Sequence, residues 1–413
     1  MKILMICQDV RIDRRIVLQA QTLMAGGYQC EILARAEPTG PILKDETDGG
    51  IPVLSIRVEG KDPRFRWLYR LTKLGGHRGY KGAVNVAKLW GSMTAKNTFN
   101  VLALPVAVRA QADVYHAHDL INLPVAYQAA KSRKAKLAYD AHELFSEIDN
   151  RWIRIRRAYW RRTEKALLPH CLLATTVNEF IAEEMAKRYG VAAPEVIYNC
   201  PQTPEGFDPD AEHHQLRDAL HLPPDTRILL YQGWLGEGRG LEELIEGADH
   251  LRGANAVLVL MGYGESRSQL EAIASKHELG DVVRFLDPVP QGDLLDYCAS
   301  ASAGIIPYRP VDLNHYYSSP NKLFDFIQAR LPILANDLPF LHKVIVGRDI
   351  GMVAPMTTPD SVGRTMLDIL KGLDDPDTAP RWRRNLTDAA GVYNWEHEGE
   401  KLLGLFYERV GKP

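Results

Sequence analysis

The chain has 413 residues, more than one hydrophobic core usually serves, so we expect two domains of about 200 residues each. Hydrophobic residues make up 46% of the sequence and charged residues 25%, which excludes a disordered or collagen-like chain. The formal net charge of −2 hides an asymmetry, because residues 1–199 hold 30 Lys and Arg against 20 Asp and Glu. The N-terminal half is therefore cationic and suits an anionic neighbour.

The five cysteines are scattered and show no CxxC spacing, which is typical of a reduced compartment. The apolar run that opens the sequence soon meets charged residues, and no run of about 20 apolar residues follows it. We therefore expect a cytoplasmic protein whose membrane contact is peripheral, at the inner face of the cell membrane.

Short apolar runs alternate with helical patterns along the first half. The expected strands are residues 2–7, 30–34, 113–117, 136–140 and 171–176. Helices are expected near residues 14–25, from residue 121 and over residues 151–168. This alternation predicts βαβ units and a parallel sheet with helices on both faces.

Residues 201–225 are rich in proline and acid and predict a linker. The alternation then restarts, with expected strands at residues 227–233, 256–262, 282–287, 302–308, 331–337 and 350–355. The sequence thus predicts an α/β protein of two doubly wound, Rossmann-like parallel-sheet domains.

The helix over residues 151–168 reads RWIRIRRAYWRRTEKALL. Helical geometry gives it an apolar stripe that includes Trp152, Ile155 and Trp160, and an opposite side of arginines. The apolar stripe should pack on the core. No nucleic-acid recognition signature accompanies the arginines, so we expect no nucleic-acid partner. With the basic-aromatic run at residues 64–70, the arginine side suits anionic lipid or a lipid-diphosphate acceptor.

Polar side chains gather where two of the first-half strands end. DVYHAHDL places His116, His118 and Asp119 there, and KLAYDAHELF places Asp140, His142 and Glu143. In open parallel sheets, ligands bind at the carboxyl ends of strands. Three interpretations remain open at this point, namely ligand contacts, structural histidines, or a zinc site of His116 and His118 with Asp140 or His142.

Two glycine-rich turns follow strands of the second half. The first, YQGWLGEGRG, contains Gly233 and Arg239, and the second, MGYGE, contains Gly262 and Gly264. Glycines let backbone amides approach an anion, and an arginine can bind a phosphate with two hydrogen bonds.

The stretch YYSSPNKLFDF predicts a helix that Ser319 caps, with Asn321 and Lys322 in its first turn. A lysine there opposes the helix dipole, so a bound anion would compensate for it. Asp325 lies about one turn further and could accept hydrogen bonds from a ribose diol.

In this order, the motifs resemble those of the family 4 glycosyltransferases of the GT-B fold. The likeness runs from DVRIDRRIVLQAQTLMAGGYQCEIL through YDAHELF, VIYNCP, YQGWLGEGRGLEELIEGA and SSPNKLFDFIQARLPILA to YNWEHEGEKLLGLFYERV. It implies an acceptor domain over residues 1–199 and a donor domain over 200–393, which face a central cleft. The helix at residues 394–413 is expected to pack back on the first domain.

The resemblance implies that a sugar moves from a nucleoside diphosphate donor to a glycan, lipid-linked or small-molecule acceptor, with retention and without a required metal or other cofactor. A UDP-sugar is favoured over a GDP-sugar, and polysaccharide biosynthesis is the expected setting. The expected catalytic residues are His118, Arg239 and Lys322. The donor site would comprise Gly233, Arg239, Gly262, Gly264, Ser319, Asn321, Lys322 and Asp325. The acceptor-side candidates are Asp9, Arg11, His116, Asp140, His142 and Glu143.

Two positions depart from the family pattern. Trp234 stands where the family often has an arginine, and Tyr317 stands where its paired-acid motif commonly begins with glutamate. Lys322 can offset the first change, whereas the second leaves the donor sugar open. A GT-B nucleotide-sugar epimerase and a non-catalytic nucleotide-sugar-binding protein are the alternatives.

Overall fold

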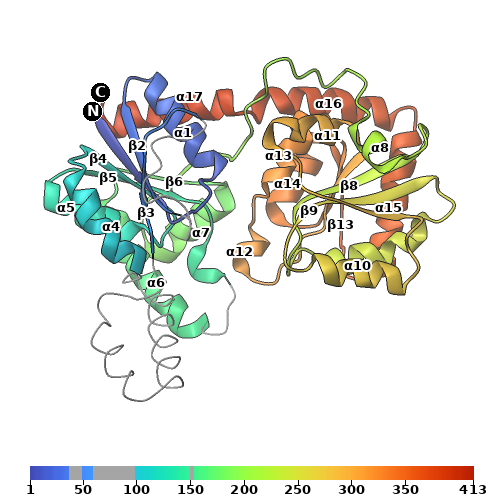
Figure 1. Cartoon of the computed structure of the whole chain (residues 1–413), viewed down its shortest axis with the longest axis horizontal. Coiled ribbons are helices and arrows are strands. Elements are labelled where there is room, and N and C mark those ends of the chain that lie inside the picture. The colour runs from blue at the N-terminus through green and yellow to red at the C-terminus, as the bar shows by residue number, and fades with distance from the viewer. Residues whose placement is uncertain (37–48, 59–97, 149–152) are drawn as a thin grey trace. The chain divides into compact units, whose positions relative to one another are not determined.

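The computed structural model describes residues 1–36, 49–58, 98–148 and 153–413 (Figure 1). The basic-aromatic run at residues 64–70 lies outside these residues. The chain divides into two compact units, which we call unit 1 (Met1–Ile197 with Gly399–Pro413) and unit 2 (Tyr198–Glu398). Each unit is built on one parallel sheet, so the predicted fold class is confirmed.

The described residues of unit 1 form a sheet of seven parallel strands in the order β3-β2-β1-β4-β5-β6-β7. Their bounds are β1 Lys2–Ile6, β2 Gln29–Arg35, β3 Val53–Ile56, β4 Val114–His118, β5 Lys136–Ala141, β6 Leu173–Thr176 and β7 Glu195–Val196. Strand order reverses on either side of β1, which pairs with β2 and with β4. The carboxyl ends of β1 and β4 therefore form a switch point, where such sheets bind ligands.

Helices cover both faces of this sheet. In the described part of unit 1 they are α1 Arg14–Ala25, α4 Thr98–Arg109, α5 Leu123–Arg133, α6 Ile153–Leu167 and α7 Glu179–Tyr189, with the 3₁₀ turns η2 Phe145–Glu147 and η3 Leu168–His170. Asp13 caps α1 by accepting from the Arg15 amide at 2.7 Å. This cap fixes the first turn of α1, from which Arg15 reaches Asp140 of β5.

The C-terminal segment belongs to unit 1 from Gly399 onward. It comprises the end of α17 Trp395–Leu405 and the π-helical turn η6 Phe406–Val410. The ring of Tyr28 stacks on that of Tyr407 at 6.0 Å, and its hydroxyl donates to the Gly411 carbonyl at 2.6 Å.

Unit 2 has six parallel strands in the order β10-β9-β8-β11-β12-β13. Their bounds are β8 Arg227–Trp234, β9 Ala256–Tyr263, β10 Val283–Leu286, β11 Ala303–Ile306, β12 Ile333–Asn336 and β13 Gly351–Ala354. Its helices are α8 Gln215–Leu220, α9 Leu241–Gly247, α10 Arg267–Lys276, α11 Leu294–Ala299, α12 Leu313–Tyr316, α13 Asn321–Gln328, α14 Pro339–Arg348, α15 Pro359–Asp374 and α16 Thr378–Val392, with the 3₁₀ turns η4 Ala248–Leu251 and η5 Gln291–Asp293. The predicted linker thus contains a helix, α8, because Leu216 finds a buried position in unit 2.

Helix α6 corrects the prediction for residues 151–168. Trp160 is fully buried as expected, but Ile155 is 60% exposed and Glu164 is buried. Glu164 can lie inside because both of its carboxylate oxygens accept hydrogen bonds, from the hydroxyls of Tyr139 at 2.8 Å and Tyr189 at 2.6 Å. Hydrophobic periodicity misses a buried carboxylate of this kind.

The arginines of α6 are also not a uniformly solvated face. Arg157 and Arg161 turn toward Glu147, which is 2% exposed, with N–O distances of 3.3 and 2.8 Å. Arg188 of α7 pairs with the same carboxylate at 2.5 Å. The face of α6 that remains exposed consists of Arg154, Ile155, Ala158, Arg162, Lys165 and Ala166. Among the described residues, no helix has the length and hydropathy to cross a bilayer.

Candidate active site

The two predicted glycine turns lie at the carboxyl ends of β8 and β9. A Cβ on Gly262 would lie 1.8 Å from the Gly233 carbonyl oxygen, and one on Gly264 would lie 2.1 Å from the Leu235 carbonyl oxygen. These two glycines therefore let neighbouring backbone segments of unit 2 approach each other. Gly233 differs, because a Cβ there would face Nζ of Lys322 at 3.7 Å.

Two cations meet at the ring of Tyr308. Cζ of Arg239 lies 4.1 Å from the ring centroid and Nζ of Lys322 lies 5.0 Å from it. Lys322 also sits 3.4 Å from the centroid of Tyr231, and Arg239 lies 5.5 Å from that of Trp234. Aromatic faces attract cations, so these rings fix both charges at one place without neutralising them.

Lys322 has an unusual environment for a lysine. Its residue is 5% exposed, and Nζ has no hydrogen-bond partner among the described residues. Burial, with a further contribution from the charge of Arg239, lowers the pKa of Lys322 well below its ordinary value. Within the described part of the chain, Nε of Arg239 likewise has no partner. An anion that contacts both groups would remove this cost of burial.

Helix α13 follows the exposed aromatic Tyr316 and the half-buried Tyr317. The predicted cap by Ser319 is wrong, because Pro320 occupies the N-cap position and no side chain caps the helix. The extended backbone of Pro320 (ψ 130°) moves the helix start one residue further along. The hydroxyls of Ser318 and Ser319 are buried and have no partner within the residues described.

The two other predicted donor-site residues of α13 already have protein partners. Asn321 Oδ1 accepts from Asn199 Nδ2 at 2.9 Å. Asp325 is 3% exposed, and its Oδ2 accepts from Gln232 Nε2 at 3.0 Å. A ligand hydroxyl would therefore have to share or replace these contacts.

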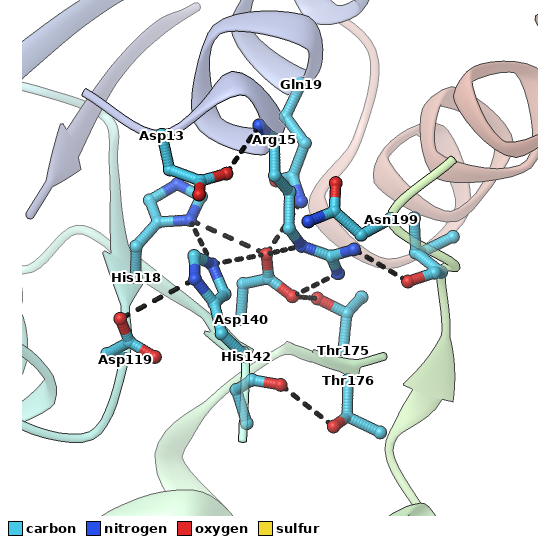
Figure 2. A network of polar contacts seen from close by, with 12 residues as sticks. Asp13, Arg15, Gln19, His118, Asp119, Asp140, His142, Thr175, Thr176 and Asn199 are labelled. Atoms are coloured by element: carbon cyan, nitrogen blue, oxygen red, sulfur yellow. Dashed lines mark hydrogen bonds and ion pairs between the residues drawn. The ribbon is translucent and has the colours of Figure 1, made fainter. Parts of the chain in front are cut away.

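Asp140 is the centre of a buried polar network in unit 1 (Figure 2). Arg15 donates from Nε to Oδ2 and from Nη2 to Oδ1, both at 2.7 Å. Gln19 donates to Oδ2 and Thr175 to Oδ1, also at 2.7 Å each. Burial by itself would raise the pKa of Asp140, but the charge and hydrogen bonds of Arg15, together with the charge of His142, hold that pKa well below its usual range.

Three histidines extend this network. His118 Nδ1 lies 3.3 Å from His142 Nε2 and 3.5 Å from Asp140 Oδ2 (Figure 2). His142 lies between Asp140 and Asp119, whose carboxylates outweigh burial and raise its pKa to about 9. Burial lowers the pKa of His118, and it lowers that of His116 well below the ordinary value. The rings of His116 and His118 lie 4.3 Å apart.

His118, Asp140 and His142 come close enough together to consider a metal site. The donor set does not fit one. Both oxygens of Asp140 are occupied by Arg15, Gln19 and Thr175. A cation beside Asp140 would also meet the charge of Arg15, whereas ligating carboxylates and histidines must offer free lone pairs.

The remaining acceptor-side candidates lie at the rim of this network. Asp9 is half-buried, and burial raises its pKa, an effect that His142 opposes. Arg11 is exposed and Glu143 is half-buried. The network thus gathers His116, His118, Asp140 and His142 at the carboxyl ends of β4 and β5.

Sequence reasoning missed Arg15, Gln19 and Thr175 in unit 1, and Tyr231, Gln232 and Tyr308 in unit 2. It placed Asp119 at the strand end but gave it no role. One signal could have found Arg15. It lies in the first turn of α1, where a cation opposes the helix dipole, which is the argument that singled out Lys322.

Two family models match most of the chain. Residues 12–200 match the model described as Glycosyltransferase Family 4, and residues 213–387 match the one described as Glycosyl transferases group 1. The two regions follow each other in the order of units 1 and 2.

Curated relatives match shorter segments. WcaI of Escherichia coli K12, named for colanic acid biosynthesis, is 38% identical over 76 residues, which is 18% of this chain and 19% of that protein. The amylovoran biosynthesis glycosyltransferase AmsK of Erwinia amylovora is 26% identical over 172 residues, which is 41% of this chain and 42% of that protein. The chain thus matches less than half the length of these two relatives.

A solved structure matches the whole chain. Alr3699/HepE of Anabaena, in complex with UDP and glucose, has a TM-score of 0.71 at 14% identity over 99% of this chain and 100% of that one. At this identity the likeness shows the fold, which is built from two Rossmann-like domains. The ordered motifs, the two family models and the fold agree, and the chain belongs to the family 4 glycosyltransferases of the GT-B type.

Proposed function

We propose that the protein transfers a sugar from a nucleoside diphosphate sugar, with UDP-glucose as the favoured donor class, to a glycan or lipid-linked acceptor. The observation that carries this proposal is the pair of cations at Tyr308, where Lys322 is buried without a hydrogen-bond partner among the described residues. A diphosphate supplies the acceptor oxygens that both cations lack.

The chemistry requires stabilisation of a leaving diphosphate. The bond between the anomeric carbon and the β-phosphate oxygen breaks, and its electron pair stays on that oxygen. Arg239 and Lys322 neutralise the charge that develops there, a role in which preorganised cations are most effective. The acceptor hydroxyl attacks the same face of the sugar and passes its proton to the departing phosphate, which gives retention without a protein base.

The identities of donor and acceptor rest on the relatives. The structure of HepE was solved with UDP and glucose, which supports a UDP-sugar donor over a GDP-sugar. WcaI and AmsK are named for the biosynthesis of colanic acid and of amylovoran, which supports a growing glycan or its lipid-linked form as the acceptor. The network around Asp140 in unit 1 supplies the acceptor-side and sugar contacts in this proposal.

A thermal-shift panel tests the donor assignment. We expect UDP and UDP-glucose to raise the unfolding midpoint, and uridine and glucose not to, because the diphosphate carries the binding energy. The shift should grow with ligand concentration as RT ln(1 + [L]/Kd). A panel in which no nucleoside diphosphate shifts the midpoint would contradict the proposal.

His118 is proposed to contact the transferred sugar and not a metal. We expect His118→Ala to lower turnover about tenfold to a hundredfold, the cost of one lost transition-state hydrogen bond of about 1.5–3 kcal/mol. The affinity for UDP should stay near that of the wild type, because UDP lacks the sugar. Loss of activity on chelation that zinc restores would instead support a metal site.

We further propose peripheral contact between the exposed face of α6 and anionic lipid. Arg154, Arg162 and Lys165 lie on this face together with the exposed apolar side chain of Ile155. Each basic residue near an anionic surface contributes about 1 kcal/mol, so the contact should be reversible and sensitive to salt.

Charge reversal of Arg154 and Arg162 tests this contact without disturbing the pairs of Glu147. We expect the doubly substituted protein to sediment less with phosphatidylserine vesicles at low salt than the wild type. The matched control reverses two exposed cations of α15, Arg364 and Lys371. Equal sedimentation of the wild type with neutral and anionic vesicles would contradict the proposal, because it would show that this face of α6 does not bind anionic lipid.

A further inference from the structure

His118 is fully buried, and among the described residues one of its two ring nitrogens, Nδ1, has polar neighbours. Nδ1 faces His142 Nε2 at 3.3 Å and Asp140 Oδ2 at 3.5 Å. Nε2 is buried and has no hydrogen-bond partner among the residues that the structure describes. What Nε2 can do depends on which nitrogen of the neutral ring carries the proton.

His142 determines this, because its environment favours the doubly protonated ring. Its Nδ1 lies 3.5 Å from Asp119 Oδ2 and its Nε2 lies 3.1 Å from Asp140 Oδ2. These carboxylates outweigh burial, and they outweigh the opposing charge of Arg15, so the pKa of His142 rises to about 9. Asp9 adds a further acid whose charge interacts with His142. At neutral pH both ring nitrogens of His142 therefore carry hydrogen.

The positions of the hydrogens between the two rings follow from this. Oδ2 of Asp140 already accepts from Arg15 and Gln19 at 2.7 Å each. His142 Nε2 lies within hydrogen-bond distance of both Oδ2, at 3.1 Å, and His118 Nδ1, at 3.3 Å, so its hydrogen can be shared between these two atoms. A second hydrogen on His118 Nδ1 would face it across 3.3 Å, whereas a lone pair there can accept it.

The backbone at Asp119 provides independent support. Asp119 has a left-handed φ of +65°, which is uncommon for a residue other than glycine. Its amide donates to the Asp140 carbonyl at 2.9 Å, which holds the strained turn at the end of β4. Strain of this kind persists where it places a functional group, and here it places the carboxylate against His142.

We propose that the Asp119–His142 pair fixes His118 as its Nε2–H tautomer, so that His118 presents a hydrogen-bond donor to the ligand. His142 and Asp119 are then positioning residues that act through His118. The group that His118 contacts must be an oxygen with a free lone pair, and under the proposed function this is an oxygen of the donor sugar. In this tautomer Nε2 offers no lone pair for proton abstraction or for a metal.

The test is long-range proton–nitrogen NMR on the full chain labelled with nitrogen-15 histidine, without ligand. We expect His118 as the Nε2–H tautomer and His142 as a doubly protonated ring at neutral pH. The two signals are assigned by their loss in His118→Ala and His142→Gln. A wild-type His118 that carries its proton on Nδ1 would overturn the proposal.

Two pairs of variants separate positioning from folding. His142→Gln keeps an N–H donor near the Nε2 position and should preserve the tautomer, whereas His142→Phe removes that donor and should let Nδ1–H form toward Asp140. Asp119→Gly removes the carboxylate and relieves the positive φ, so the variant should fold at least as well as Asp119→Asn. Both substitutions should lower the pKa of His142 by about 1–3 units, the usual effect of an opposite charge.

An unchanged tautomer of His118 in His142→Phe, or an unchanged titration of His142 in both Asp119 variants, would contradict the proposal. These measurements need no substrate, so they stand even if the proposed function fails. Addition of UDP-glucose then tests the contact itself, because a ligand oxygen on His118 should move the Nε2–H signal, while UDP alone should not.

Discussion

Replacing Lys322 by methionine is expected to weaken the binding of UDP-glucose and to stabilise the folded protein. Loss of a charge-assisted hydrogen bond costs about 1.5–3 kcal/mol, which corresponds to roughly a tenfold to hundredfold weaker affinity. Methionine matches the length of lysine and packs well on aromatic rings such as Tyr231 and Tyr308. Removal of a buried amine that lacks a partner in the described residues should raise the unfolding free energy by about 1 kcal/mol.

The gain in stability should depend on pH. Because the pKa of Lys322 is lowered in the ligand-free folded state, that state releases the proton at a lower pH than the unfolded chain does, and a bound diphosphate would raise this pKa again and keep Lys322 charged. The wild type therefore gains stability as pH rises toward the ordinary lysine pKa of about 10.4, and its deficit relative to Lys322→Met shrinks. Denaturant unfolding at several pH values measures this. A variant that loses stability and keeps its affinity for UDP-glucose would contradict the account of Lys322.

Replacing Arg15 by methionine is expected to lower the unfolding free energy of unit 1 by about 3–5 kcal/mol, the cost of leaving a buried charge without its partner. Asp140 would keep Gln19 and Thr175 but lose both hydrogen bonds of the guanidinium. Urea unfolding followed by far-UV circular dichroism measures the change.

Two further variants make the result specific. Arg11→Met removes an exposed arginine from the segment that precedes α1 and should change stability by less than about 0.5 kcal/mol. Arg15→Met combined with Asp140→Asn removes both charges and should recover part of the loss. If the double variant is no more stable than Arg15→Met, the loss comes from packing and not from the ion pair.

The fold and the family were predictable because they depend on repeated local patterns. Short apolar runs alternate with amphipathic segments in both halves, and the two sheets follow them. The glycine turns and the motif around Lys322 are also local patterns, and the sequence alone identified both. In the structure Gly233 and Lys322 lie close together.

The polar networks were not predictable in the same way. Arg15 and Asp140 lie 125 residues apart, and no spacing rule joins them. Glu147 pairs with arginines of two helices, so arginines that periodicity assigns to solvent turn inward. In each case the oppositely charged partner that stabilises the buried charge lies on another helix or strand. A pattern read within one segment of the sequence does not include that partner.

The most direct test of the central claim is the equilibrium titration of UDP-glucose into the full chain by calorimetry, with wild type, Arg239→Ala and Lys322→Met. Arg364→Ala, which removes an exposed arginine of α15, serves as the control. The account predicts that the wild type and the control bind with the same affinity, and that each of the two site variants binds at least about tenfold more weakly. Equal affinity of all four proteins, or no binding to the wild type, would contradict it.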